Sequence, residues 1–283
     1  MTISSSNNKV AVVTGSSSGI GYETSLMLAR NGFITYATMR NLNKSENIKF
    51  NAGRDNLPVR LAQLDVTDDV SIKNAVQAVL SETDKLDVLV NNAGYVLEGA
   101  FEHLSMNELK EQYETNVFGM IRTTQAVLPI MRKQKSGTIV NISSVAGKFG
   151  YPGGSAYVST KFAVEGLSES MAYELEPFGI KVIIIEPGVI RTNIFNSVVV
   201  AKNSKDPNSP YTQTTQKMAS AFEELMKNSS SSPELVAKVV LEAVTSDNPN
   251  LRYLAGKDAE TWLDAKRNMT DEKFYEMMKQ NLM

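Results

Sequence analysis

Short apolar runs rich in β-branched residues alternate with segments of helical period along most of the chain. Such alternation is typical of a parallel sheet that helices bury on both faces. The pattern predicts seven strands, at residues 10–14, 33–39, 59–65, 86–91, 138–142, 181–186 and 251–254. We therefore expect an α/β fold with a doubly wound sheet of seven mainly parallel strands.

The carboxyl ends of parallel strands meet at one edge of such a sheet, because the crossovers between them are right-handed. Ligands of doubly wound sheets bind along that edge. One long segment, residues 188–232, interrupts the alternation there and contains Pro207, Pro210 and an apolar helical pattern that includes Met218 and Phe222. Such excursions are often substrate lids, and a surface insertion without a binding role is the alternative.

A glycine-rich loop connects the first predicted strand to a helix. Gly15 permits a tight turn, Gly19 lets backbone N–H groups approach a pyrophosphate, and Gly21 allows helix and strand to pack closely. The helix N-terminus offers free N–H donors to an anion. This context predicts a dinucleotide-phosphate loop made of Gly15, Ser16, Ser17, Ser18, Gly19, Ile20 and Gly21.

The same loop also matches G-x-S-x-G, the nucleophile elbow of α/β-hydrolases, in which Ser17 would attack an ester. That mechanism needs a histidine late in the chain, whereas the single histidine is His103. The elbow would also follow the first strand, which leaves few elements to build an oxyanion loop. A hydrolase that uses Ser17 is therefore a remote alternative, and we expect His103 at the surface.

An arginine follows the second predicted strand, where NAD-binding folds have a carboxylate. An acidic residue about 20 residues beyond the glycines binds the ribose 2′-hydroxyl of NAD. Here Met39 is followed by Arg40, and a guanidinium pairs with a 2′-phosphate that a carboxylate would repel. Arg40 therefore predicts NADP(H) rather than NAD(H), with help from the Ser16 and Ser17 hydroxyls. A solvated loop charge is the alternative for Arg40.

Tyr157 and Lys161 are four residues apart in a segment of helical period, so they share one helix face. A free tyrosine ionises near pH 10, and a nearby ammonium would lower that pKa by roughly two to three units. Tyr157 would then act as an acid and a base near neutrality. Ser144 follows a predicted strand upstream and is expected to orient a carbonyl oxygen, with Ser143 as the alternative.

Composition narrows the chemistry further. The 283 residues include no cysteine and one histidine, which excludes disulfides, thiolate nucleophiles and metal sites built on those residues. The formal net charge of −2 gives no long-range attraction to nucleic acid or anionic lipid. Residues 1–9 lack the apolar run of a signal peptide, and no stretch predicts a membrane span. We expect a cytoplasmic protein that binds no metal.

Together these motifs resemble those of the short-chain dehydrogenase/reductase superfamily, over residues 9–195. They follow one another in the superfamily's order: Thr14-Gly-x-x-x-Gly-Ile-Gly21, Asn91-Asn92-Ala93-Gly94, Asn116, Ser144, Tyr157-x-x-x-Lys161 and Pro187-Gly188. The Thr38-Met39-Arg40-Asn41 stretch and the long lid are most similar to NADP-using 17β-hydroxysteroid and retinol dehydrogenase-like members.

For the cofactor, the resemblance implies contacts from further loops at the carboxyl edge. The adenine would lie between Asp65 and Val66, and Lys161 would bind the nicotinamide ribose. The ribose next to the adenine would contact Asn92, Ala93 and Gly94. Ile190 and Thr192 would fix the nicotinamide carboxamide, and Pro187 and Gly188 before them would also contact the cofactor.

For the reaction, the resemblance implies a catalytic set of Asn116, Ser144, Tyr157 and Lys161. Asn116 would interrupt its helix and hold a water that links Lys161 to solvent. The expected fold is then a single Rossmann-type domain over residues 1–283. It comprises a cofactor-binding and catalytic core at 9–195, a substrate lid at 188–232 and a C-terminal helical tail at 258–283.

The sequence thus predicts an NADP(H)-dependent oxidoreductase that transfers hydride between nicotinamide and a carbonyl or secondary alcohol. Phe195, Val198 and Phe222 in the lid favour an apolar ketone or aldehyde, of the steroid, retinoid, fatty or lactone type, although they could instead pack the lid on the core. A non-catalytic NADP-binding regulator is the alternative function. The resemblance also implies a homodimer or homotetramer, and the tail is expected to pack on its own subunit or a neighbour.

Overall fold

The computed structural model describes residues 8–190, 198–228 and 231–283. Within these residues, a seven-stranded sheet has the order β3-β2-β1-β4-β6-β7-β9, and every neighbouring pair is parallel. Its strands are β1 Val10–Val13, β2 Ile34–Met39, β3 Val59–Gln63, β4 Val88–Asn91, β6 Gly137–Ile142, β7 Ile180–Pro187 and β9 Arg252–Ala255. The predicted doubly wound sheet of seven strands is confirmed.

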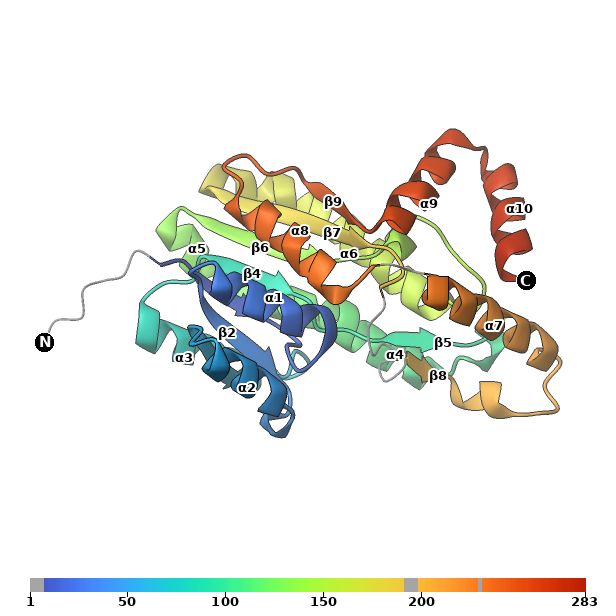
Figure 1. Cartoon of the computed structure of the whole chain (residues 1–283), viewed down its shortest axis with the longest axis horizontal. Coiled ribbons are helices and arrows are strands. Elements are labelled where there is room, and N and C mark those ends of the chain that lie inside the picture. Colours follow the sequence, from blue (N-terminus) through green and yellow to red (C-terminus); the bar gives the residue numbers. More distant parts are fainter. Residues whose placement is uncertain (1–7, 191–197, 229–230) are drawn as a thin grey trace, which may run out of the picture.

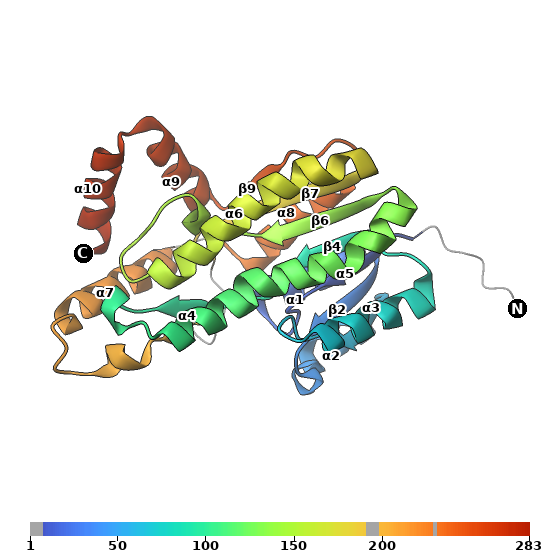
Figure 2. The ribbon, with the colours of Figure 1, turned by 180° about the vertical axis from the view of Figure 1, so that it is seen from behind.

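Helices cover both faces of this sheet (Figures 1 and 2). One face carries α1 Gly19–Arg30, α2 Glu46–Arg54 and α8 Pro233–Thr245. The other face carries α3 Asp69–Thr83, α5 Gly119–Gln134 and α6 Ser155–Leu175. Side chains alternate along a strand, so Ala11 and Val13 pack towards α1 and α8 while Val10 and Val12 pack towards α3 and α5. No helix in the described ranges is long and apolar enough to cross a bilayer.

Additional elements gather beyond the carboxyl edge of the sheet (Figure 1). Two three-residue strands, β5 Val96–Glu98 and β8 Val198–Val200, form a small parallel sheet of their own. The sequence pattern did not predict them, because three residues are too few to show an alternation. The other elements at this end are α4 Met106–Tyr113, α7 Thr212–Asn228, α9 Lys257–Asn268 and α10 Asp271–Leu282.

The C-terminal helices pack on their own subunit, one of the two arrangements that the sequence left open. Leu263 of α9 and Met278 of α10 are buried in a cluster with Val145 and Phe149, which follow β6. The Phe149 ring meets the Phe274 ring edge-on, with 5.2 Å between the centroids. The tail therefore covers the chain segment that leads away from the end of β6.

His103 is buried, so the prediction that it lies at the surface is wrong. Its Nδ1 atom is 3.0 Å from the hydroxyl oxygen of Ser204, and its Nε2 atom is 2.8 Å from that of Ser209. Its ring also lies edge-on to Tyr211. These partners come from a distant part of the chain, which is why local sequence reasoning did not find them.

A charged cluster lies where β7, β9 and α6 meet. Arg252 of β9 donates hydrogen bonds to Glu165, Glu169 and Glu186, and Lys148 lies 4.0 Å from the Glu186 carboxylate. The Glu186 side chain is almost fully buried. Burial, together with the negative charge of Glu165, raises the pKa of Glu186 from 4.5 to about 7. Ionised Glu186 therefore costs folding free energy.

This cluster predicts a specific pH dependence of stability. A raised pKa in the folded state means that the Glu186 contribution is fully present below pH 4.5 and is lost as the pH rises through about 7. Glu186→Gln cannot ionise, so its free energy of unfolding should fall less than that of the wild type over this range, by up to roughly 3 kcal/mol. Urea unfolding at several pH values measures the free energy of unfolding of both proteins. The matched control is Glu169→Gln, at the half-exposed partner of Arg252; equal slopes for wild type and Glu186→Gln would contradict the prediction.

Candidate active site

The glycine loop between β1 and α1 adopts a backbone that requires glycine at two positions. Gly15 has φ +70° and Gly19 has φ +59°, a region that side chains other than glycine rarely enter. A Cβ atom at Gly21 would overlap the Asn92 amide and the Gly15 carbonyl. All three glycines are therefore needed to bring the start of α1 close to the loop that follows β4.

The N-terminus of α1 is suited to an anion. Ser18 is the N-cap residue, yet its side chain makes no capping hydrogen bond, and the first turn contains no acidic residue. First-turn N–H groups of a helix have no intrahelical partner, and together with the helix dipole they favour negative charge. The uncapped turn beside the glycine loop thus fits the pyrophosphate of a dinucleotide.

Ser16 cannot serve as predicted, because its hydroxyl is fully buried and faces inward. It donates to the Val13 carbonyl at 2.9 Å and accepts a hydrogen bond from Ser25. The expectation that the Ser16 hydroxyl binds a cofactor phosphate is therefore wrong, and its role is to hold the turn. Ser17 is half-buried and Ser18 is exposed, so both remain accessible from the loop.

Thr14 begins the glycine motif, and the structure gives it a bracing role that the sequence did not predict. Its hydroxyl accepts hydrogen bonds from the backbone N–H groups of Asn92 and Ala93, each at 3.0 Å. The Asn92 side chain in turn donates to the Thr14 carbonyl at 2.9 Å. The amide of Asn92 is thus engaged within the protein, and it braces the loop after β1 against the loop after β4, where Gly94 is exposed.

Arg40 directly follows β2 at the same edge and is exposed. Its carbonyl accepts a hydrogen bond from Gln63, while within the described residues its guanidinium takes part in no ion pair. Asp65 and Val66 follow β3 nearby; Asp65 holds the turn by accepting hydrogen bonds from Thr67, and Val66 is buried. The residues predicted to surround the adenosine half of a cofactor therefore lie along adjacent strand ends.

Asn116 lies in a π-helical turn, Glu114–Phe118, between α4 and α5. The interruption of this helix is as the resemblance implied. The Asn116 amide donates to the Tyr95 carbonyl at 2.9 Å and to the Thr160 hydroxyl at 3.2 Å, and its oxygen accepts from the Tyr95 N–H at 3.1 Å. Single π turns often mark functional sites, and this one ties Asn116 to the helix that carries Lys161.

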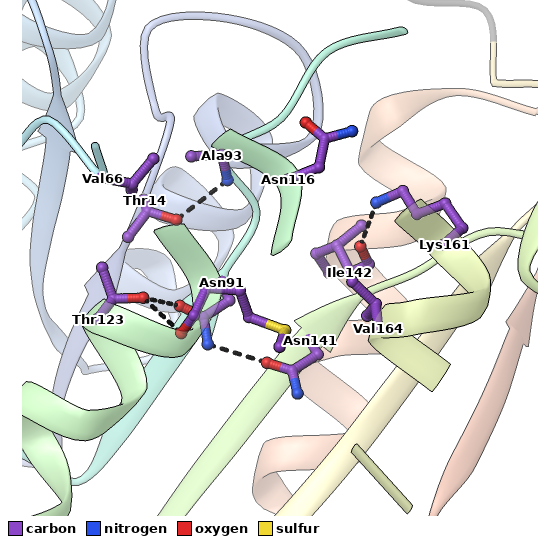
Figure 3. Close-up of a pocket in the computed structure, with 11 residues that line it drawn as sticks. Thr14, Val66, Asn91, Ala93, Asn116, Thr123, Asn141, Ile142, Lys161 and Val164 are labelled. Carbon is purple, nitrogen blue, oxygen red and sulfur yellow. Dashed lines mark hydrogen bonds between the residues drawn. The ribbon is translucent and has the colours of Figure 1, made fainter. Parts of the chain in front are cut away.

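A small polar cavity of about 10 Å³ separates Asn116 and Lys161 from the ends of β1 and β4. Figure 3 shows Thr14 and Ala93 on one side of this cavity and Lys161 on the other. Its polar walls also include Asn91 and Asn141, which are hydrogen-bonded to each other at 2.9 Å. A volume of this size, with several polar groups around it, accommodates about one water molecule.

Lys161 and Tyr157 lie one turn apart on α6, as their spacing predicted. The Lys161 ammonium is buried and donates a hydrogen bond to the Ile142 carbonyl at the end of β6, at 2.7 Å. The Nζ atom lies 5.5 Å from the centroid of the Tyr157 ring. The ammonium is therefore anchored on the backbone of β6 with the phenol ring beside it.

The acidities of this pair differ from the sequence expectation. Burial raises the pKa of Tyr157 to about 12, and a hydrogen bond with Ser144 offsets only part of this increase. Burial also lowers the pKa of Lys161 to about 8. The predicted lowering of the Tyr157 pKa by Lys161 is therefore wrong for the protein alone. The spacing in the sequence shows that the two groups are close enough to attract each other. It does not show that both are buried, and burial has the larger effect on their pKa values.

Ser144 and Tyr157 share a second, larger cavity. Ser144 follows β6, and its hydroxyl accepts a hydrogen bond from the Ala146 N–H at 3.1 Å. Its neighbour Ser143 is buried elsewhere, with a hydroxyl that has no hydrogen-bond partner in the described structure. The cavity has a volume of about 90 Å³. Its apolar lining includes Val96, Val145, Phe149, Ile190, Val198, Phe222, Trp262, Met278 and Leu282.

The segment that follows β7 forms one wall of this cavity and is held by the C-terminal tail. The Val189 N–H donates to the Asp258 carboxylate of α9 at 2.5 Å, and a Cβ atom at Gly188 would overlap that carboxylate. Pro187 and Ile190 are buried. Two predicted residues, Thr192 and Phe195, lie outside the described residues.

A family model described as short chain dehydrogenase matches residues 9–203. The chain belongs to the short-chain dehydrogenase family. The match covers every strand end described above except that of β9, so this dehydrogenase has the family's core arranged around both cavities.

Two relatives show the breadth of this similarity. The chain is 36% identical over 248 residues to 3-ketodihydrosphingosine reductase of Bacteroides thetaiotaomicron, which covers 88% of each chain. It is 35% identical over 252 residues to retinol dehydrogenase 8 of Bos taurus, which covers 86% of this chain and 80% of that one. The resemblance to retinol dehydrogenase-like members is thereby confirmed.

Two solved structures agree with this assignment. A short-chain dehydrogenase from Streptomyces avermitilis superposes with a TM-score of 0.82 at 34% identity, over 97% of both chains. An alcohol dehydrogenase from Thermococcus sibiricus, complexed with 5-hydroxy-NADP, superposes with a TM-score of 0.73 at 26% identity. It covers 88% of this chain and 97% of that one. A nicotinamide cofactor is therefore supported for this dehydrogenase.

Three features of the dehydrogenase's site were not found from the sequence. Tyr151 and Glu98 line the larger cavity together with Trp262 from the tail. Tyr151 follows β6 in a turn without periodicity, and Glu98 belongs to a strand too short to recognise. Trp262 is distant in sequence from every motif, so the fold alone brings it to the site.

The glycine loop gives a direct test of the cofactor cradle. Gly21→Ala should weaken NADPH binding by about tenfold or more and lower the Tm, because its Cβ atom would force Asn92 and the Gly15 carbonyl apart. Thermal shift with and without NADPH measures both effects. Gly166→Ala is the matched control, since nothing lies within 4 Å of a Cβ atom there. An unchanged NADPH affinity in Gly21→Ala would contradict the assignment of the loop.

Proposed function

We propose that this short-chain dehydrogenase is an NADP(H)-dependent reductase of apolar ketones or aldehydes. The observation that carries the proposal is the placement of Ser144 and Tyr157 in one largely apolar cavity, backed by Lys161 and Asn116 on a separate polar cavity. A carbonyl group in the apolar cavity would meet the hydroxyl groups of Ser144 and Tyr157. Lys161, on the polar cavity, would resupply the proton.

In this mechanism the chain's own residues handle the carbonyl oxygen and its proton. A bound reduced nicotinamide would supply the hydride to the carbonyl carbon and be oxidised as the carbonyl is reduced to an alcohol. Tyr157 donates the proton of its hydroxyl to the carbonyl oxygen, whose π electron pair forms the new O–H bond. Ser144 donates a hydrogen bond that steadies the negative charge developing on that oxygen.

The acidities of the pair decide which group holds the proton. With a pKa of about 12, Tyr157 is protonated at neutral pH, although burial makes it a weaker acid than a free tyrosine. Lys161, with a pKa of about 8, can return a proton to Tyr157 at little cost. The polar cavity, with room for about one water, offers a route from Lys161 past Asn116. Asn116 is a positioning residue in this scheme.

The preference for NADP(H) rests on Arg40. Its exposed guanidinium lies at the end of β2, and no described carboxylate neutralises it. A 2′-phosphate at this position would gain a charge-assisted hydrogen bond. Ser17, in the adjacent loop, can add a hydroxyl contact, whereas Ser16 cannot.

An apolar substrate is supported by the cavity and by the relatives. Val198 and Phe222 come from the segment 188–232, which we assign as a substrate lid, and both line the cavity. The tail contributes Trp262, Met278 and Leu282 to the same lining. The names of the relatives, 3-ketodihydrosphingosine reductase and retinol dehydrogenase 8, point to substrates of the fatty and retinoid classes.

Removing one hydroxyl tests the catalytic role. Tyr157→Phe should lower kcat for ketone reduction by about 100-fold or more, because the proton donor is lost, while the Kd for NADPH stays within about threefold. Absorbance of NADPH follows turnover, and its fluorescence follows binding.

Tyr151→Phe is the matched control, because Tyr151 lines the same cavity and has no assigned proton transfer. Its kcat should fall by less than about tenfold. Equal losses in the two variants would contradict the assignment of Tyr157 as the acid.

Removing one guanidinium tests the cofactor preference. Arg40→Ala should raise the KM for NADPH by about tenfold or more and leave the KM for NADH within about threefold, because only NADPH carries the 2′-phosphate. Steady-state kinetics with both cofactors measure the two values. Lys49→Ala, at an exposed cation on α2, should change neither. A parallel rise for both cofactors in Arg40→Ala would show that Arg40 does not select NADP.

A further inference from the structure

One acidic side chain lines the cavity that holds Ser144 and Tyr157. Glu98 is the last residue of β5, and it is the one charged residue among the described residues of the lining. Most of the other lining residues are apolar, and Tyr151 and Trp262 add one polar atom each. Glu98 is half-buried, and a carboxylate among apolar side chains loses part of its hydration, which is costly without a partner.

The backbone of β5 fixes the direction of Glu98. Side chains alternate along a strand, so Val96 and Glu98 line the cavity while Leu97 packs with Ala156 and Ala201 on the opposite side. The Glu98 carbonyl accepts a hydrogen bond from the Ala201 N–H at 2.8 Å. Strand pairing therefore holds Glu98 at the cavity, whether or not its carboxylate has a partner.

The protein supplies no partner for this carboxylate within the described ranges. No lysine, arginine or histidine there forms an ion pair with Glu98, and no described group donates a hydrogen bond to its side chain. Its neighbour in register on β8 is Val200, which cannot pair with a charge. Burial alone raises the pKa of the Glu98 carboxyl. Within the described ranges, therefore, no group of the protein offsets the partial desolvation of this half-buried carboxylate, which leaves a place for a cationic partner.

Glu98 shares its cavity with Tyr151 and Tyr157. The pKa of the Tyr151 phenol is raised by burial first, and then by the charges of Glu98 and Tyr157. Tyr151 is therefore within electrostatic reach of both groups. One small molecule in this cavity can therefore face both Tyr157 and Glu98.

We propose that Glu98 binds a cationic amine of the substrate, so that this enzyme acts on apolar carbonyl compounds, or the corresponding alcohols, that carry a primary amine. An ammonium would both neutralise the carboxylate and donate the hydrogen bonds that the protein does not provide. Aliphatic amines ionise like lysine, with a pKa of about 10.4, and are charged at neutral pH. The inference rests on the proposed function, since it places the amine relative to the carbonyl that Tyr157 protonates.

The experiment compares matched substrates in the oxidation direction with NADP as hydride acceptor. Long-chain secondary alcohols carry either a primary amine or a methyl group on the carbon next to, or second from, the carbinol carbon. The readout is the ratio of kcat/KM for the amine to kcat/KM for the methyl compound. Wild type should favour the amine by about tenfold or more, and Glu98→Gln should bring the ratio close to one.

Glu242→Gln is the matched control, because it makes the same change at an exposed site on α8. It should keep the wild-type ratio. The assignment is overturned by a wild-type ratio near one or by an unchanged ratio in Glu98→Gln. It is also overturned if wild type prefers a third compound, in which a hydroxyl group replaces the amine. The last result would mean that Glu98 accepts a hydrogen bond from a neutral group instead.

A binding measurement separates this inference from the proposed function. Octylamine should raise the Tm of wild type more than that of Glu98→Gln, whereas 1-octanol should shift both equally, with no cofactor present. If this difference appears but no alcohol or ketone is turned over, the proposed function fails and the amine site stands. If turnover appears without any amine preference or difference in Tm shift, the amine site fails and the proposed function stands.

Discussion

A buried ammonium group must be hydrogen-bonded, and this requirement organises the active edge of the protein. Lys161 meets it by donating to the Ile142 carbonyl at the end of β6, at 2.7 Å. The contact fixes α6 against the carboxyl end of the sheet. Tyr157 lies one turn earlier on the same helix. Its phenol is therefore placed beside Ser144, which follows the end of β6. The geometry of the catalytic set thus follows from one hydrogen bond and one helical turn.

Burial of this pair decides its chemistry as well as its geometry. Removal from water raises the pKa of Tyr157 to about 12 and lowers that of Lys161 to about 8. Lys161 is therefore the stronger acid of the two, which is the reverse of their order in water. Tyr157 is therefore protonated at neutral pH, and the Lys161 ammonium is acidic enough to reprotonate it once it has given up its proton. Desolvation also raises the pKa of Glu98, which lines the same cavity as Tyr157.

Sequence reasoning succeeded where the physical cause is local. The valine-rich runs of β1 and β4 indicated buried parallel strands, and Gly15 indicated the tight turn that the structure shows with a positive φ. It failed where contacts between distant parts of the chain determine burial or the direction of a side chain. His103 is buried by partners from a distant segment, and the Ser16 hydroxyl turns inward to Ser25. The short strands β5 and β8 carry no readable period, so Glu98 was not recognised as part of the cavity.

Transfer of a labelled hydride tests the central claim that this site reduces a carbonyl. NADPH deuterated at the transferred position of C4 is incubated with a pool of long-chain ketones and amino ketones, and the alcohols are analysed by mass spectrometry. The account predicts an alcohol with one deuterium on the carbinol carbon, formed by wild type and greatly reduced in Tyr157→Phe. NADPH binding without deuterium in any alcohol, or equal labelling by both proteins, would contradict it.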